Sequence, residues 1–225
     1  MCIRDSPSIP PKATWYEEFL AYSYGDHGKE NQKLKVEKAI EDKKIIEAKR
    51  KNPYTINKTI DQLREETENA GSLIPLPKNT KYKSLVAGNV NAEWLTCGEV
   101  NENKIFMFMH GGGYYRGSAA ATRATVARIS AETKIKCLSI NYRLAPEHPF
   151  PAAIDDTYSA YEWLINEGIS PEQIIVSGQS AGGGLCLALL LKIKENNFSQ
   201  PLGAVALSPW TDLSQSCLLY TSPSP

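Results

Sequence analysis

Residues 174–184 read IIVSGQSAGGG, a β-branched run followed at once by a serine between glycines. The run QIIVS (173–177) is typical of a buried parallel strand. After Ser180, the segment LCLALLLKIKE continues an apolar pattern that predicts a helix beginning near Ala181. This stretch therefore predicts a strand, a tight turn and a helix, with Ser180 at the apex of the turn.

The central residues, Gly178-Gln179-Ser180-Ala181-Gly182, form a G-x-S-x-G pattern that indicates a nucleophilic serine between a strand and a helix. Glycine suits positions 178 and 182 because a side chain there would collide with the neighbouring strand and helix. The start of the helix also offers free backbone N–H groups and a partial positive charge. The alternative is an ordinary glycine-rich turn, since the pattern alone also arises by chance. The flanking strand and helix favour the nucleophile.

The segment His110-Gly111-Gly112-Gly113 directly follows another apolar run, KIFMFM. Consecutive glycines expose backbone N–H groups, which stabilise the oxyanion formed in acyl transfer. A flexible turn would not explain why this motif and the serine motif occur together in this order. Tyr114 and Tyr115, which follow, either line an apolar acyl or alcohol pocket or pack in the ordinary way.

Short apolar runs alternate with helical patterns along the second part of the chain. The runs are KSLVAG (83–88), AEWLTC (92–97), KIFMFM (104–109), IKCLSI (135–140), QIIVS (173–177) and GAVALS (203–208). The first two predict an antiparallel pair, and the others predict buried parallel strands. A helix is expected over 151–167, from Pro151 to a stop at Gly168. The alternation predicts an α/β fold with a doubly wound, mostly parallel sheet.

Two helices are expected before the first strand. Residues 29–51 carry an excess of basic residues. We interpret them as a solvated helix rather than as a surface for an anionic partner. The second helix would place Ile56, Ile60 and Leu63 on one face and stop at Gly71.

The two ends of the chain look foreign to the rest. MCIRDS at the start and CLLYTSPSP at the end resemble translated sequencing-adapter tracts, and the closing segment has no helical or strand period. The expected organisation is a non-native tail (1–6), an N-terminal helical cap region (7–76), an incomplete α/β core (77–216) and a second non-native tail (217–225).

Composition narrows the class of protein. The chain has 225 residues, 42% of them hydrophobic, which suffices for a sizeable core. Its 25 basic and 25 acidic residues balance, so a nucleic-acid partner is not expected. No apolar stretch is long enough for stable membrane insertion, and no secretory signal is evident. Five widely spaced cysteines show no metal-binding pattern and predict free thiols in the cytoplasm.

Four motifs resemble those of the hormone-sensitive-lipase group of α/β-hydrolases, over roughly residues 55–216. They are HGGGYYRGS (110–118), NYRLAPEHPFPAAIDD (141–156), SGQSAGGG (177–184) and SPWTDL (208–213). The resemblance implies a hydrolase of small carboxylic esters with short or medium acyl chains, which needs no cofactor and carries an N-terminal cap. It maps the nucleophile onto Ser180 and the oxyanion-hole N–H donors onto Gly111, Gly112 and Ala181. Gln179 stands where the family more often has Asp, a position outside the triad.

The general base is missing from this pattern. α/β-Hydrolases place an acid and then a His after the serine, yet no His follows Ser180. Of the later acids, Asp212 lies one strand too early, and Glu195 falls within the predicted helix. None of the three histidines (His27, His110 and His148) is expected to be the base. We therefore expect a C-terminally truncated esterase that is itself inactive. The alternative is a non-catalytic small-ligand receptor on the same scaffold. The oligomeric state is not indicated.

Overall fold

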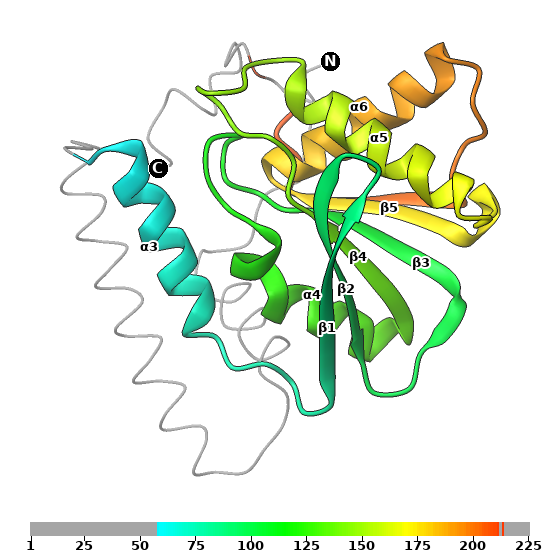
Figure 1. Cartoon of the computed structure of the whole chain (residues 1–225), viewed down its shortest axis with the longest axis horizontal. Helices are drawn as coiled ribbons and strands as arrows, with labels where there is room; N and C mark the ends of the chain where they lie inside the picture. Colours follow the sequence, from blue (N-terminus) through cyan, green and yellow to red (C-terminus); the bar gives the residue numbers. More distant parts are fainter. Residues whose placement is uncertain (1–57, 212, 214–225) are drawn as a thin grey trace, which may run out of the picture. The chain divides into compact units, whose positions relative to one another are not determined.

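The computed structural model describes residues 58–211 and residue 213, in which one helix precedes three consecutive strands and helices then alternate with strands (Figure 1). The strands are β1 (Thr80–Ala87), β2 (Val90–Cys97), β3 (Asn101–Met109), β4 (Ile135–Ile140), β5 (Ile174–Gln179) and β6 (Gly203–Leu207). The helices are α3 (Ile60–Ser72), α4 (Ala119–Thr133), α5 (Ala152–Asn166), α6 (Ala181–Glu195) and the short 3₁₀ helix η1 (Pro171–Gln173). Each strand overlaps the run predicted for it.

The strands form one sheet in the order β1-β2-β4-β3-β5-β6. β1 pairs antiparallel with β2, and β2 pairs antiparallel with β4. The pairs β3/β4, β3/β5 and β5/β6 are parallel. Met109 at the end of β3 lies opposite Gly178 near the end of β5, so the segments that follow these strands leave the same edge of the sheet. The predicted antiparallel pair and the mostly parallel α/β sheet are confirmed.

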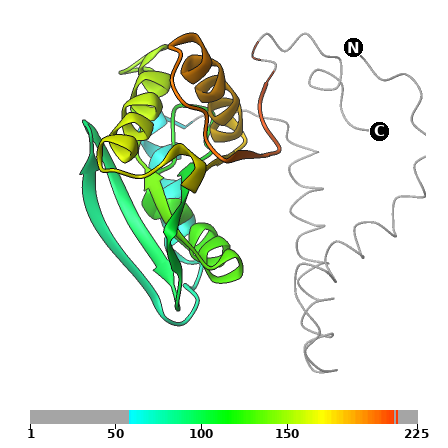
Figure 2. The same cartoon turned by 90° about the vertical axis from the view of Figure 1, so that its right-hand side faces the viewer.

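Helices cover both faces of the sheet, as Figure 2 shows. On one face, the alternate β3 residues Ile105, Met107 and Met109 join a buried cluster with residues of α5 and α6. On the other face, Phe106 and Phe108 pack with residues of α4. Because successive strand residues point to opposite faces, a strand buried on both sides reads as a continuous apolar run. None of the helices in the described part of the chain is long and apolar enough to cross a membrane.

The prediction that Gly71 stops its helix is wrong. α3 begins after Thr59, whose side chain and that of Gln62 form a reciprocal capping box, and it continues to Ser72. Gly71 instead lies where α3 crosses α4, because a Cβ atom there would be only 2.4 Å from the carbonyl oxygen of Ala121. A glycine within the last turn therefore allows two helices to approach closely.

Several predictions fall outside the described residues. They concern the helix over 29–51, Ile56, His27, Asp212 and both end segments, so they stay predictions.

Candidate active site

Ser180 lies at the turn between β5 and α6 with φ 55° and ψ −116°. A non-glycine residue rarely adopts this conformation, and surrounding contacts must hold it in place. The Ser180 N–H donates to the Leu207 carbonyl of β6 at 2.9 Å. The Ser180 carbonyl accepts from the N–H groups of Gly184, at 3.0 Å, and Trp210, at 2.9 Å. The strained turn is therefore fixed by β6, by α6 and by the segment after β6.

The glycines on either side of Ser180 allow this turn to fit against its neighbours. A Cβ atom on Gly178 would lie 2.1 Å from the Gly182 carbonyl oxygen. A Cβ atom on Gly182 would lie 2.1 Å from the carbonyl oxygen of Met109 in β3. Both contacts are with backbone atoms, which no side-chain rotation can relieve. The predicted need for small residues at these two positions is confirmed.

The glycine loop after β3 lies directly beside Ser180. A Cβ atom on Gly111 would be 2.9 Å from the Gln179 carbonyl oxygen and 3.3 Å from the Ser180 Cβ. Gly112 has φ 123°, and its carbonyl accepts from the N–H groups of Tyr115 and Arg116 at 3.3 and 3.2 Å. These bonds close a tight turn.

Ala181, the remaining predicted donor, is buried as the first residue of α6. Its N–H therefore has no partner within the helix. The glycine loop after β3 and the beginning of α6 thus meet at Ser180. Both segments carry N–H groups that the sequence predicts as oxyanion donors. Their roles as oxyanion donors stay predictions.

His110 is fully buried between the end of β3 and the glycine loop. Its Nδ1 lies 2.8 Å from the Gly111 carbonyl oxygen, which can only accept, so we assign the proton to Nδ1. Its ring stacks on that of Tyr142 with centroids 4.3 Å apart, and the Tyr142 hydroxyl donates to the His110 carbonyl at 2.7 Å. Burial lowers the pKa of His110 to about 4, so the ring is neutral at neutral pH. The side chain supports the glycine loop.

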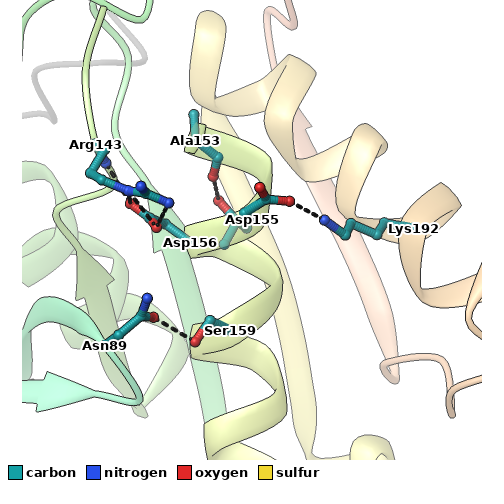
Figure 3. A network of polar contacts seen from close by, with 8 residues as sticks. Asn89, Arg143, Ala153, Asp155, Asp156, Ser159 and Lys192 are labelled. Atoms are coloured by element: carbon teal, nitrogen blue, oxygen red, sulfur yellow. Dashed lines mark hydrogen bonds and ion pairs between the residues drawn. The ribbon is translucent and has the colours of Figure 1, made fainter. Parts of the chain in front are cut away.

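The motif over residues 141–156 anchors the loop that follows β4. Asp156 of α5 accepts from the backbone N–H of Arg143 at 2.7 Å and forms an ion pair with its guanidinium at 2.8 Å (Figure 3). The neighbouring Asp155 binds Lys192 of α6. Because Tyr142 precedes Arg143, these contacts also fix the ring on which His110 stacks. We infer a structural role for this motif.

An open cleft of about 480 Å³ contains Ser180, Gly111 and Gly112 together. One wall is a face of α3 that sequence reasoning assigned to no site. The full lining is Glu66, Thr67, Ala70, Gly71, Ile74, Gly111, Gly112, Arg116, Gly117, Ala121, Thr122, Gln179 and Ser180. The α3 residues in this lining, Glu66, Thr67, Ala70 and Gly71, lie on one face of the helix. Because they are small or polar, they do not form the apolar stripe by which a buried helix face is recognised in a sequence.

The two tyrosines after the glycines do not line this cleft. The Tyr114 ring packs 6.1 Å from the ring of Trp210 and 6.5 Å from that of Tyr142. The Tyr115 carbonyl accepts a hydrogen bond from Arg64. Ordinary packing therefore describes the Tyr114 side chain better than a substrate pocket does.

Arg64 of α3 attaches that helix to the glycine loop. Its Nε donates to the Tyr115 carbonyl at 2.8 Å, and its terminal nitrogens bind the Ala145 carbonyl at 3.0 Å and both oxygens of Glu147. One turn later, Glu68 accepts from the hydroxyl of Ser118 at 2.8 Å. The Arg64 guanidinium holds the pKa of Glu147 near 2, well below its usual range. Hydrogen bonds from α3 thus hold the loop on both sides of Gly117, at Tyr115 and at Ser118.

Comparison with known proteins agrees with this arrangement. Residues 106–221 match the model of a family described as having the alpha/beta hydrolase fold. An esterase of Acinetobacter venetianus is 30% identical over 169 residues, which are 75% of this chain and 55% of that protein. An acetyl-hydrolase of Streptomyces hygroscopicus is 33% identical over 129 residues, 57% of this chain and 43% of that protein.

A crystallised esterase from the bacterial hormone-sensitive lipase family is 35% identical, with a TM-score of 0.72. The match covers 77% of this chain and 59% of that one, so the chain spans about half the length of the relatives it matches. The family model covers just over half of the chain. The sheet topology, the serine turn and these matches together show that this chain belongs to the α/β-hydrolase family, as a hormone-sensitive-lipase-like member.

Proposed function

We propose that the complete protein hydrolyses carboxylic esters with short or medium acyl chains through an acyl-enzyme. Ser180 Oγ attacks the ester carbonyl and transfers its proton to a general base. The resulting oxyanion accepts hydrogen bonds from the N–H groups of Gly111, Gly112 and Ala181. Collapse of this intermediate expels the alcohol, which takes up the proton, and water then hydrolyses the acyl-serine. This chemistry needs neither a metal nor an organic cofactor.

The observation that carries the proposal is the strained Ser180 at the beginning of α6, in a cleft with the glycine loop. A hydroxyl held at a helix N-terminus lies beside free N–H groups and a positive partial charge, both of which stabilise a developing oxyanion. Esterases among the relatives support the same reaction class.

The histidines of the described residues do not supply the base. His110 binds the Gly111 carbonyl through Nδ1 and is buried, and His148 is exposed and does not line the cleft. In this proposal the acid and the base lie outside the 225 residues. We therefore expect this chain to hydrolyse esters on the order of 10⁴–10⁶ times more slowly than a complete triad would.

The free, buried thiols of Cys97, Cys137 and Cys186 support the proposed cytoplasmic location.

Covalent labelling tests the nucleophile in the complete protein, expressed from the uninterrupted coding sequence, because phosphonylation of a serine needs the same general base as turnover. The complete protein is incubated with a fluorophosphonate, and the modified peptide is identified by mass spectrometry. We expect the adduct on Ser180 and its loss in Ser180→Ala. Ser208→Ala is a matched control, because Ser208 also follows a strand with a positive φ (43°), and it should leave labelling unchanged. Adducts spread over exposed serines, or unchanged labelling in Ser180→Ala, would contradict the proposal. Rapid hydrolysis of an aryl ester by the 225-residue chain, lost in Ser180→Ala, would contradict the predicted inactivity.

A non-catalytic small-ligand receptor is the second candidate. It is favoured by one observation, that no histidine of the described residues lines the cleft. The uninterrupted coding sequence separates the two. A downstream acid and His at the family spacing means an enzyme, and a continued chain without that His means a receptor.

A further inference from the structure

Arg116 has a fixed backbone beside the proposed oxyanion site. Its N–H donates to the Gly112 carbonyl at 3.2 Å, and a Cβ atom on Gly112 would be 2.1 Å from the Arg116 carbonyl oxygen. The residue lines the cleft together with Ser180 and is partly buried. The proposed reaction assigns it no role, because a neutral ester offers no charged partner for a guanidinium.

Two charged side chains line the cleft, and only one of them has an ion-pair partner among the described residues. Glu66 also lines it, but its carboxylate already binds Lys58 at 2.5 Å. Among residues 58–211 and 213, the Arg116 guanidinium has neither a hydrogen bond nor an ion pair, and it lies 5.4 Å from the centre of the Tyr115 ring. By contrast, Arg64 and Arg123 are bound to carboxylates. Within the described residues, the cleft that contains Ser180 therefore presents a positive charge with no carboxylate partner.

We propose that Arg116 selects esters carrying a second, anionic group, such as a carboxylate. This inference rests on the proposed function and specifies its substrate class. A guanidinium presents a planar set of donors that matches a carboxylate, and its pairing strengthens in a partly desolvated cleft. The ester carbonyl would lie at Ser180 and the glycine loop, and the anionic end would lie at Arg116.

The test compares monoethyl glutarate with its neutral primary amide, which has nearly the same shape. Ligand-observed NMR gives the affinity of each for the intact chain at neutral pH, and this measurement requires no turnover. We expect the acid to bind about five- to tenfold more tightly than the amide, with the difference shrinking at high salt. Arg116→Gln should abolish the difference.

Arg128→Gln is the control, because it removes the same charge from a residue of α4 that binds the Pro75 and Ala124 carbonyls and does not line the cleft. It should keep the preference for the acid. Equal affinities in the wild type, no measurable binding of the acid at millimolar concentration, or a preference that survives Arg116→Gln would each overturn the inference. Fluorophosphonate labelling of Ser180 is scored separately, in the complete protein that carries the general base. Labelling without a charge preference refutes only this inference, whereas a charge preference without labelling refutes the esterase proposal.

Discussion

Replacing Gly182 with alanine would place a methyl group where α6 crosses β3. The added carbon would lie 2.1 Å from the Met109 carbonyl oxygen and 2.5 Å from that of His110. Ordinary contacts between carbon and neighbouring heavy atoms are about 3.5 Å, so the first turn of α6 must retreat by roughly 1 Å or more. That turn carries Ala181 and follows Ser180, so the displacement acts on stability and on the site together.

The expected magnitude follows from the nature of the obstacle. Because the blocking atoms belong to the backbone of a central strand, no rotamer change relieves the contact. Overpacking of a core ordinarily destabilises by about 1–3 kcal/mol, and the better helix propensity of alanine offsets up to about 1 kcal/mol. The rigid obstacle places Gly182→Ala near the upper end, a loss of about 2 kcal/mol net. A shift of about 1 Å should also slow phosphonylation of Ser180 by roughly 100-fold.

Urea unfolding followed by circular dichroism measures the first effect. Fluorophosphonate labelling of the complete protein, which carries the general base, measures the second here and in the predictions below. Gly203→Ala in β6 is the matched control, because a Cβ atom there meets nothing within 4 Å, and its unfolding free energy should stay within about 0.5 kcal/mol of the wild type. If Gly182→Ala unfolds like that control and labels at the wild-type rate, the close crossing of α6 and β3 is not what the structure indicates.

Three further predictions concern single side chains of the site. Ser180→Gly should be about 1 kcal/mol more stable in urea than Ser180→Ala, because glycine adopts the φ of 55° without strain, and both variants should lose labelling. Burial lowers the pKa of His110 to about 4 from 6.5, so below pH 6.5 the unfolded chain binds this proton more readily than the folded chain. The stability from this group is therefore complete above pH 6.5 and is lost as the pH falls to about 4, a total of about 3 kcal/mol. The difference in unfolding free energy between the wild type and His110→Asn across this window measures it. Arg64→Met removes the bonds to the Tyr115 and Ala145 carbonyls, so the amides of residues 111–118 should exchange hydrogen faster and Ser180 should label about tenfold more slowly.

Each of these has an outcome that contradicts it. Equal stability of the glycine and alanine variants at position 180 would mean that the turn stores no strain. A His110→Asn variant with the same pH dependence as the wild type would show that this ring does not titrate between pH 4 and 6.5. Lys58→Met is the control for Arg64, since it breaks only an exposed ion pair with Glu66. Equal hydrogen-exchange rates of residues 111–118 in Arg64→Met and Lys58→Met would show that Arg64 does not position the glycine loop.

What the sequence by itself determined was local. The strand, turn and helix around Ser180 follow from an apolar run, a serine between glycines and a second apolar run, and the structure places them as β5 and α6. The glycine loop follows from its position after a predicted strand. Such features depend on neighbouring residues, whose backbone preferences and periodicity are visible in any single sequence.

Only the tertiary structure decided which distant residues complete the cleft. Arg64 binds residues 51 and 83 positions away, and no periodicity connects them. Gly71, expected to end a helix, instead lies where α3 crosses α4. A small residue is needed there because the backbone of Ala121 in α4 lies too close for a side chain. Tyr114 packs on aromatic rings outside the cleft, whereas Arg116 lines it. Contacts between residues far apart in the sequence depend on how the helices and strands are arranged in space. Hydrophobic periodicity and turn residues report only on neighbouring residues, so they do not predict such contacts.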